Sequence, residues 1–189
     1  MTKIIYGLKN LHYALVTVGE DGAVTYAKPI AIPGAREMGL DAQGEDTNVY
    51  ADDSQYVVIS VNTGYEGDLT VLKLPDSFYT DCLGQTLDAN GALIESEEDI
   101  KKPFALLGEF STESAEKKRF VLYNCVAGRP TFGSSTKEET VEPTELVVPI
   151  TAAAAADTGA TKATLTNTAS KEKFDSWFDA VYIPAATQA

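Results

Sequence analysis

The chain has 189 residues, of which 44% are apolar, and this length and composition are those of a folded protein with one hydrophobic core. Its 28 acidic residues against 15 basic ones give a net charge of −13 at pH 7, which argues against a surface that binds nucleic acid through clustered Lys and Arg. No apolar run approaches the roughly 20 residues that span a bilayer, and the N-terminal apolar stretch is too short for a signal peptide. We expect a protein that stays in the cytosol unless it leaves as part of a larger assembly.

Most of the chain is predicted to form strands. Residues 12–18 alternate in hydrophobicity, and the turn sequence at 19–22 predicts a hairpin with residues 24–27. The later β-rich runs are residues 55–61, 65–74, 104–110, 119–128 and 145–151, with residues 62–64 separating the first two. Their spacing and their β-branched and aromatic content predict a mainly β fold, a β-sandwich or barrel.

The run at residues 119–128 is apolar on both faces. One face carries Phe120, Leu122 and Val126, and the other carries Val121, Tyr123 and Cys125. A strand of a lone sandwich usually has one solvated face, so we expect either a helix or a neighbouring subunit to cover the second one. The pattern therefore hints at oligomerisation.

One flanking helix is predicted over about residues 75–83. Pro75 and Asp76 are typical of a helix start, and Gly84 can adopt the left-handed conformation that ends a helix. The apolar residues expected to dock this helix onto the sheet are Phe78, Cys82 and Leu83.

A second, short C-terminal helix is predicted at residues 171–180. Phe174, Trp177 and Phe178 fall at helical spacing there, and an aromatic stripe of this kind indicates a face that packs on the core.

Two segments are predicted to be long loops, and a third is ambiguous. Residues 39–53 are polar and acidic and contain glycine, and residues 131–144 are rich in Ser, Thr, Glu and Pro. Loops of this length are uncommon in a compact domain and are usually functional or disordered. The alanine-rich residues 152–160 are ambiguous, because alanine favours helix. We interpret them, with residues up to 166, as a hairpin with small side chains.

Catalytic constellations are not found in the sequence. His12 is the single histidine and lies within an alternating strand, where a structural role is usual. Residues 157–160 read Asp-Thr-Gly-Ala, as in aspartic proteases, but that chemistry needs two such aspartates, and Asp-Thr-Gly is also a common turn sequence. We therefore expect no enzyme activity and no cofactor.

Metal sites are not predicted either. Cys82, Cys125 and one histidine are too few ligands for a structural zinc site, and we favour two buried thiols over a disulfide. Glu66 and Asp68 project from one face of a strand. We interpret them as a solvated face in preference to a weak cation site.

Several segments, in order along nearly the whole chain, resemble the major tail protein family of siphophages and related prophages. They are residues 6–14 (YGLKNLHYA), 50–53 (YADD), 64–69 (GYEGDL), 74–78 (LPDSF), 83–84 (LG), 104–110 (FALLGEF), 119–125 (RFVLYNC), 135–140 (STKEET) and the Trp177-Phe178 pair. No single segment is as specific as a metal-ligand pattern, but the ordered set is a strong signal.

The resemblance implies a single tail tube domain over residues 1–189, a β-sandwich flanked by a helix, without the C-terminal immunoglobulin-like extension of some relatives. It also implies rings of six copies that stack into a tube in the virion tail, after assembly in the host cytoplasm. The tube would enclose the tape measure protein, join the tail terminator and distal tail proteins, and pass DNA without binding it specifically.

Residues 39–53 are similar to the family's loop that reaches the neighbouring ring. The candidate inter-subunit contacts are Asp41, Glu45, Asp46, Tyr50, Asp52, Asp53, Tyr65 and Glu66.

Two other functions stay open at this point. One is a single-ring tail terminator or distal tail component, which would never form a filament. The other is a β-sandwich that binds a carbohydrate or small ligand. Its site would need exposed aromatic side chains, for which Tyr50, Tyr56 and Tyr65 are the candidates, although packing between subunits explains them at least as well.

Overall fold

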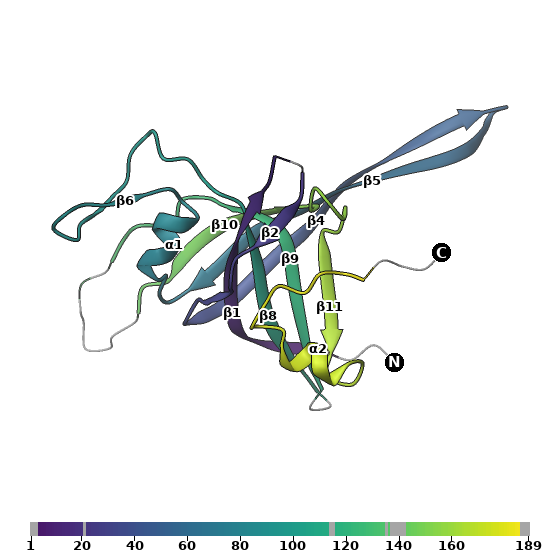
Figure 1. Cartoon of the computed structure of the whole chain (residues 1–189). Coiled ribbons are helices and arrows are strands. Elements are labelled where there is room, and N and C mark those ends of the chain that lie inside the picture. Colours follow the sequence, from purple (N-terminus) through teal and green to yellow (C-terminus); the bar gives the residue numbers. More distant parts are fainter. Residues whose placement is uncertain (1–3, 21, 114–115, 135, 137–142, 186–189) are drawn as a thin grey trace.

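The computed structural model describes residues 4–20, 22–113, 116–134, 136 and 143–185 (Figure 1). Most of these residues lie in strands, which confirms the predicted mainly β fold. The strands are β1 (Ile5–Val18), β2 (Val24–Tyr26), β3 (Ile30–Ala31), β4 (Ala35–Ala51), β5 (Ser54–Val71), β6 (Thr86–Leu87), β7 (Leu93–Ile94), β8 (Phe104–Thr112), β9 (Lys117–Ala127), β10 (Leu146–Ala153) and β11 (Lys162–Thr166). The helices are α1 (Asp76–Asp81) and α2 (Lys171–Asp175).

The larger sheet is antiparallel and branches at β9. Its strand order is β2-β1-β8-β9-β10-β5-β4, with β3 paired to β1 and β11 paired to β9. Residues 118–122 of β9 pair with β11, whereas residues 124–127 pair with β10. The sheet therefore divides into two layers that share β9, one containing β1, β8 and β11 and the other containing β10, β5 and β4 (Figure 1).

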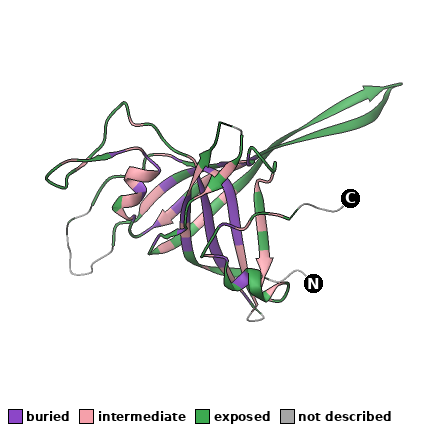
Figure 2. Ribbon diagram, viewed as in Figure 1, coloured by how far each residue is buried: buried purple, intermediate pink, exposed green. Residues whose placement is uncertain are grey.

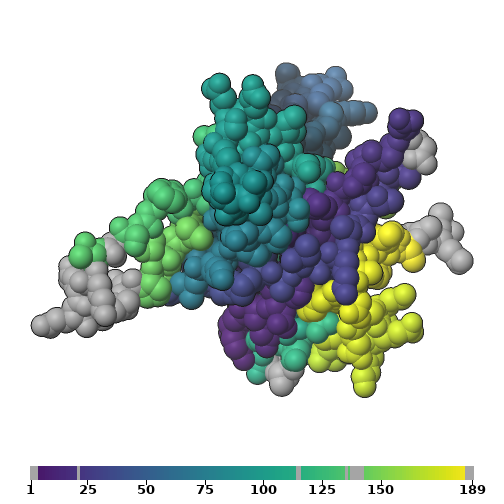
Figure 3. Space-filling view, turned by 60° about the vertical axis from the view of Figure 1, so that its left-hand side comes forward, coloured from purple at the N-terminus to yellow at the C-terminus, as the bar shows by residue number. Residues whose placement is uncertain are grey.

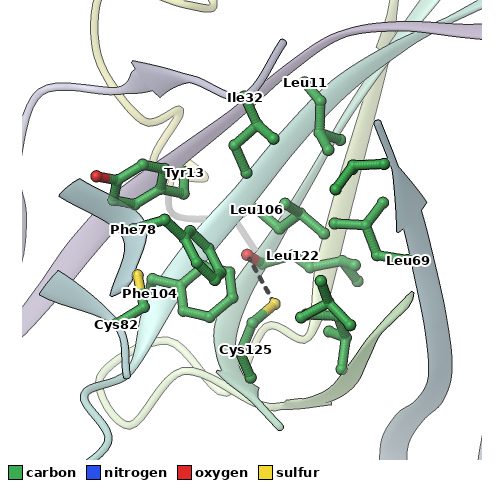
Figure 4. Close-up of a cluster of buried hydrophobic side chains, with 14 of the residues drawn as sticks. Leu11, Tyr13, Ile32, Leu69, Phe78, Cys82, Phe104, Leu106, Leu122 and Cys125 are labelled. Carbon is green, nitrogen blue, oxygen red and sulfur yellow. Dashed lines mark hydrogen bonds between the residues drawn. The ribbon is translucent and has the colours of Figure 1, made fainter. Parts of the chain in front are cut away.

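The main core lies between these two layers (Figure 4). Leu106 and Leu122 come from the first layer and Leu69 from the second, and all three are almost fully buried. The Phe78 ring of α1 packs edge-on against Tyr13 and Phe104, with ring centroids 5.2 Å and 5.4 Å apart. Edge-to-face packing is the arrangement that aromatic quadrupoles favour, so this cluster fixes α1 against the sheet.

Helix α1 lies where the sequence predicts a flanking helix. Pro75 precedes it, and Gly84 follows it with φ +81°. A Cβ atom at position 84 would lie 2.4 Å from the carbonyl oxygen of Ile100, so both the backbone conformation and the available space require glycine. In Figure 3 the segment with α1, β6 and β7 (teal) forms the front surface of the molecule, above the N-terminal strands (purple).

A second apolar cluster lies on the other face of β8 and β9. There Leu107, Val121 and Tyr123 pack against Trp177 and Val181. The chain's own C-terminal segment thus covers the second face of β9, so a helix-containing segment, not a neighbouring subunit, explains this pattern. As evidence for oligomerisation, the two-sided pattern was therefore misleading.

The predicted C-terminal helix is shorter than expected. Helix α2 ends at Asp175 instead of residue 180, and turns follow it. Hydrogen bonds hold the segment on the sheet: Trp177 Nε1 donates to the Phe120 carbonyl (3.2 Å), and the Tyr123 hydroxyl donates to the Tyr182 carbonyl (2.9 Å). The Arg119 guanidinium also donates to the Phe174 carbonyl. Trp177 and Val181 are therefore buried on the sheet although they lie beyond the end of the helix.

The prediction of a loop at residues 39–53 was wrong. Most of these residues belong to β4, which pairs with β5 along nearly its whole length. The predicted break at residues 62–64 was also wrong, because β5 runs through it with a bulge. Backbone pairing, not a buried face, makes this polar segment a strand.

Other predicted connections are confirmed in part. β1 and β2 form the expected hairpin, although Asp21 of its turn lies outside the described residues. The expected turn lies at residues 156–158, where the Gly159 N–H donates to the Ala155 carbonyl (2.9 Å). However, β10 and β11 each pair with β9 and do not form a hairpin together. Of the predicted loop at 131–144, residues 131–134, 136, 143 and 144 are irregular, and the others lie outside the described residues.

Candidate assembly surface

The β4–β5 hairpin projects far beyond the body of the protein (Figure 1). The β10 ladder on β5 ends at Tyr65, and beyond this point β4 and β5 pair only with each other. At about 3.3 Å per residue, residues 54–63 carry the hairpin about 30 Å outward. This outer part is exposed on both faces in Figure 2.

The two faces of the outer hairpin differ in chemistry. Cross-strand pairs place Glu45 opposite Val61, Thr47 opposite Ile59 and Val49 opposite Val57 on one face. We call the four side chains Val49, Val57, Ile59 and Val61 the apolar hairpin face; they are 38%, 44%, 52% and 52% exposed. The other face carries Asp46, Asn48, Val58 and Ser60. Among the residues that the structure describes, a strongly β-branched strand segment therefore stands about half exposed to solvent.

The hairpin ends in a tight turn at Asp52 and Asp53. Their φ angles are +51° and +57°, a left-handed pair that two-residue hairpin turns require. The Ser54 hydroxyl donates to the Ala51 carbonyl (3.2 Å) and closes the turn. Asn-Gly is the usual sequence for this geometry, so two adjacent aspartates adopt it with more backbone strain than Asn-Gly would.

Nearer the body, the solvent face of the β4–β5 sheet is acidic. Met38, Leu40 and Leu69 point into the core, and the residues that alternate with them point outward. The outward carboxylates are Glu37, Asp41, Glu66 and Asp68, which we call the acidic sheet face. Within the described part of the chain, none of these four forms an ion pair. Asp41 lies directly opposite Glu66, where like charges repel across the strands.

All eight predicted inter-subunit residues lie on this hairpin, but the structure does not gather them into one site. Asp41 and Glu66 lie on the acidic sheet face, whereas Tyr65, at the base of the hairpin, packs on the opposite face against the main core. The outer hairpin and its turn carry Glu45, Asp46, Tyr50, Asp52 and Asp53. Their contact with other subunits stays a prediction.

The structure thus presents a long projecting hairpin with exposed apolar side chains on a β-sandwich body. A family model described as "Phage tail tube protein" matches residues 1–181. The chain belongs to this family. No curated protein matches the chain. The family is a structural one, not an enzyme family, and it makes the protein a component of the phage tail.

In this tail tube protein, the two sequence features considered for catalysis, His12 and Asp157, make local structural contacts. The His12 ring stacks on Phe178, with centroids 4.6 Å apart. The Asp157 carboxylate accepts the backbone N–H of Thr158 (2.7 Å) in the exposed turn that the sequence predicts. Among the residues described, no group of three His, Cys, Asp or Glu side chains is placed to hold a metal ion, and no helix is long and apolar enough to cross a bilayer.

The exposed tyrosines do not form a single aromatic site. Tyr50 and Tyr56 lie near the hairpin turn, 67% and 76% exposed. Tyr65 lies at the other end of the overhang, where its hydroxyl accepts a hydrogen bond from Lys162 Nζ (2.8 Å). This separation, about 30 Å along the strand, removes the concave aromatic site that a ligand-binding sandwich would need.

Both cysteines of the tail tube protein are free thiols in the main core, which confirms the sequence interpretation. The Cys125 thiol donates to the Leu122 carbonyl (3.7 Å; Figure 4). Burial raises the pKa of Cys125 to about 12 and raises that of Cys82 as well. The thiols are therefore neutral and unreactive in the folded protein.

Sequence reasoning missed a buried ion pair behind the C-terminal segment. The Glu109 carboxylate, 1% exposed, accepts a hydrogen bond from Arg119 Nε (2.8 Å) and lies 3.5 Å from Lys9 Nζ. The Arg119 guanidinium lies over the rings of Phe174 and Phe178, at 3.9 Å and 4.6 Å from their centroids. A signal was available, because Glu109 is the one charged residue in the apolar run 104–110.

Proposed function

We propose that six copies of this tail tube protein form a ring and that the rings stack into the tail tube. The tube encloses the tape measure protein and later conducts DNA. Tail terminator and distal tail proteins bind at its two ends, and assembly takes place in the host cytoplasm. The resemblance to siphophage major tail proteins supplies the number six and these partners.

The observation that carries the proposal is the apolar hairpin face. Fully burying a Val or Ile side chain contributes about 1.5–3 kcal/mol, and these four side chains are already about half covered. A neighbouring subunit that covers the rest would contribute about 3–6 kcal/mol per hairpin before entropic costs. Repeated in every subunit, this contribution favours a polymer over free subunits.

The open edge of β4 supports the same proposal. β4 ends the strand order of the larger sheet, so its outer N–H and C=O groups have no strand beside them within the described residues. Open edges of this length invite pairing with another chain. Contacts between unlike surfaces of identical subunits close into rings or continue into filaments, and a tube of stacked rings uses both.

The acidic sheet face suggests which side of the subunit lines the channel. Its carboxylates would repel the phosphates of DNA, so that DNA passes without being held. We assign Glu37, Asp41, Glu66 and Asp68 to the lumen on this ground.

Electron microscopy of the purified full-length protein tests the proposal, with and without the tape measure protein. Stacked rings with six-fold symmetry and an open channel are expected. Single closed rings that never stack would overturn the tube in favour of a terminator-like role. Dispersed monomers at every concentration would overturn assembly altogether.

A pair of variants tests the role of the apolar hairpin face. Val57→Thr with Ile59→Thr keeps two β-branched residues in the strand but removes apolar contact, and should raise the concentration needed for tubes. The control, Asn48→Thr with Ser60→Thr, changes the opposite face and should assemble as the wild type does. All four side chains are exposed, so neither pair should lower the melting temperature of the subunit. Equal assembly by both pairs would contradict the assignment.

A further inference from the structure

A small groove opens between the two layers of the sandwich, on the side where β11 leaves the branch. Its volume is about 270 Å³. Met38, Leu40 and Leu122 contribute apolar lining, as do Phe110 and Phe120, which stack on each other with centroids 4.7 Å apart. Partly exposed aromatic and aliphatic side chains at such an opening leave room for an apolar group from outside.

Two lysines, Lys118 and Lys162, stand at the rim of this groove. Lys162 Nζ donates to the Tyr65 hydroxyl (2.8 Å) and lies 4.5 Å from the centroid of its ring. Within the described part of the chain, neither ammonium group forms an ion pair. In a chain of net charge −13, two cations at the rim of one apolar opening are complementary in charge to an acidic occupant.

The hairpin turn has the matching chemistry. Asp52 and Asp53 hold left-handed backbone conformations that Asn-Gly would adopt with less strain. The turn thus places two carboxylates side by side at the tip of the hairpin, where they can reach a cation on another molecule. Tyr50 and Tyr56 beside the turn supply exposed apolar rings.

We propose that the groove with Lys118 and Lys162 receives the hairpin turn of a second copy of this chain. Asp52 and Asp53 pair with the two lysines, and a flanking tyrosine ring enters the groove. This inference rests on the proposed stacking of subunits and names the surface that receives the hairpin.

The hairpin of the same chain cannot fill its own groove. The groove includes Tyr65 at the base of the hairpin, whereas the turn lies about 30 Å away along two paired strands (Figure 1). The occupant must therefore come from another molecule. In the proposed contact, the hairpin of one subunit would extend about 30 Å from its base to the groove of the next.

The test compares tube formation by two neutralised variants. Asp52→Asn with Asp53→Gly removes both charges and improves the turn, so the melting temperature should hold or rise. Even so, the lowest concentration that yields tubes should rise about 10-fold, the change expected for losing a close interfacial charge pair. Lys118→Gln with Lys162→Gln should cause a similar rise, and the four changes together should add little more, because both pairs remove one contact.

The matched control is Lys171→Gln with Lys173→Gln, which removes the same charge from exposed lysines of α2. It should form tubes at the wild-type concentration. Normal assembly by either neutralised pair, strictly additive effects, or an equal loss in the control would overturn the inference. A wild-type protein that forms no tubes would instead overturn the proposed function, so the two failures are distinguishable.

Discussion

Replacing Arg119 by Met tests how the C-terminal segment is held on the sheet. Arg119 is the close partner of Glu109, whose carboxylate is 1% exposed, while Lys9 lies farther away and is 46% exposed. Removing one partner of a buried ion pair costs about 3–5 kcal/mol, because the remaining charge stays buried without compensation. Methionine keeps part of the apolar contact with Phe174 and Phe178, so the lost cation–π contribution adds little to this figure.

The assay is urea unfolding of the subunit, followed by circular dichroism and by fluorescence of Trp177, the single tryptophan. A loss of 3–5 kcal/mol corresponds to a drop in melting temperature of about 6–20 °C for a chain of this size. Since Trp177 is 1% exposed in the docked segment, its emission should shift to longer wavelength before the strands unfold.

The double variant Glu109→Leu with Arg119→Met removes both charges. It should recover to within about 1 kcal/mol of the wild type, because apolar replacement of a whole buried pair is often neutral. A single variant that loses less than about 1 kcal/mol would refute this reasoning, since buried charge would then carry no penalty. A double variant as unstable as the single one would refute it as well.

Three other predictions concern the cores. Phe78→Ala should cost about 3–5 kcal/mol of unfolding free energy, because the ring is fully buried, and an unchanged melting temperature would contradict this. Burial raises the pKa of Tyr26 from 10.0 to about 12, with a smaller contribution from Asp157, and burial also raises that of Tyr123. The folded state favours the neutral phenols, so this stability is complete below pH 10 and is lost as the pH rises toward 12. Chemical unfolding followed across this range should show the loss, and constant stability would contradict it. The buried thiol Cys125 should react with a thiol reagent only after denaturation, and rapid labelling of the native protein would contradict its burial.

The sequence was sufficient for the parts of the fold in which local signals and burial agree. The apolar run at 104–110 became β8 because its side chains face one core or the other. Helix α1 was predictable because Pro75 and Gly84 mark its ends through backbone constraints that do not depend on the rest of the fold.

The long hairpin was not predictable by the same rules. Strand prediction relies on alternation between a buried and a solvated face, and most of β4 has no buried face. Residues 62–64 resembled a turn, but Gly64 has φ +116° within a bulge. A Cβ atom there would lie 1.9 Å from the Ala152 carbonyl, so its glycine serves close approach to β10.

The groove was beyond sequence reasoning for a different reason. Tyr65 and Lys162 are 97 residues apart and meet only because the sheet branches at β9. The pattern of residues along a short segment does not indicate that one strand will pair with two others in this way. The single-domain extent of the chain, residues 1–189, stays a prediction.

The shared strand β9 also determines how the subunit would carry mechanical load. A pull on the hairpin acts along β5, and β5 joins β10 over the register from Leu146↔Val71 to Ala152↔Tyr65. The force is then parallel to the strands, so the hydrogen bonds of that ladder share it at once and do not open one by one. β10 passes it to β9, which belongs to both layers. In the proposed tube, tension between neighbouring subunits would therefore be spread through the whole sandwich.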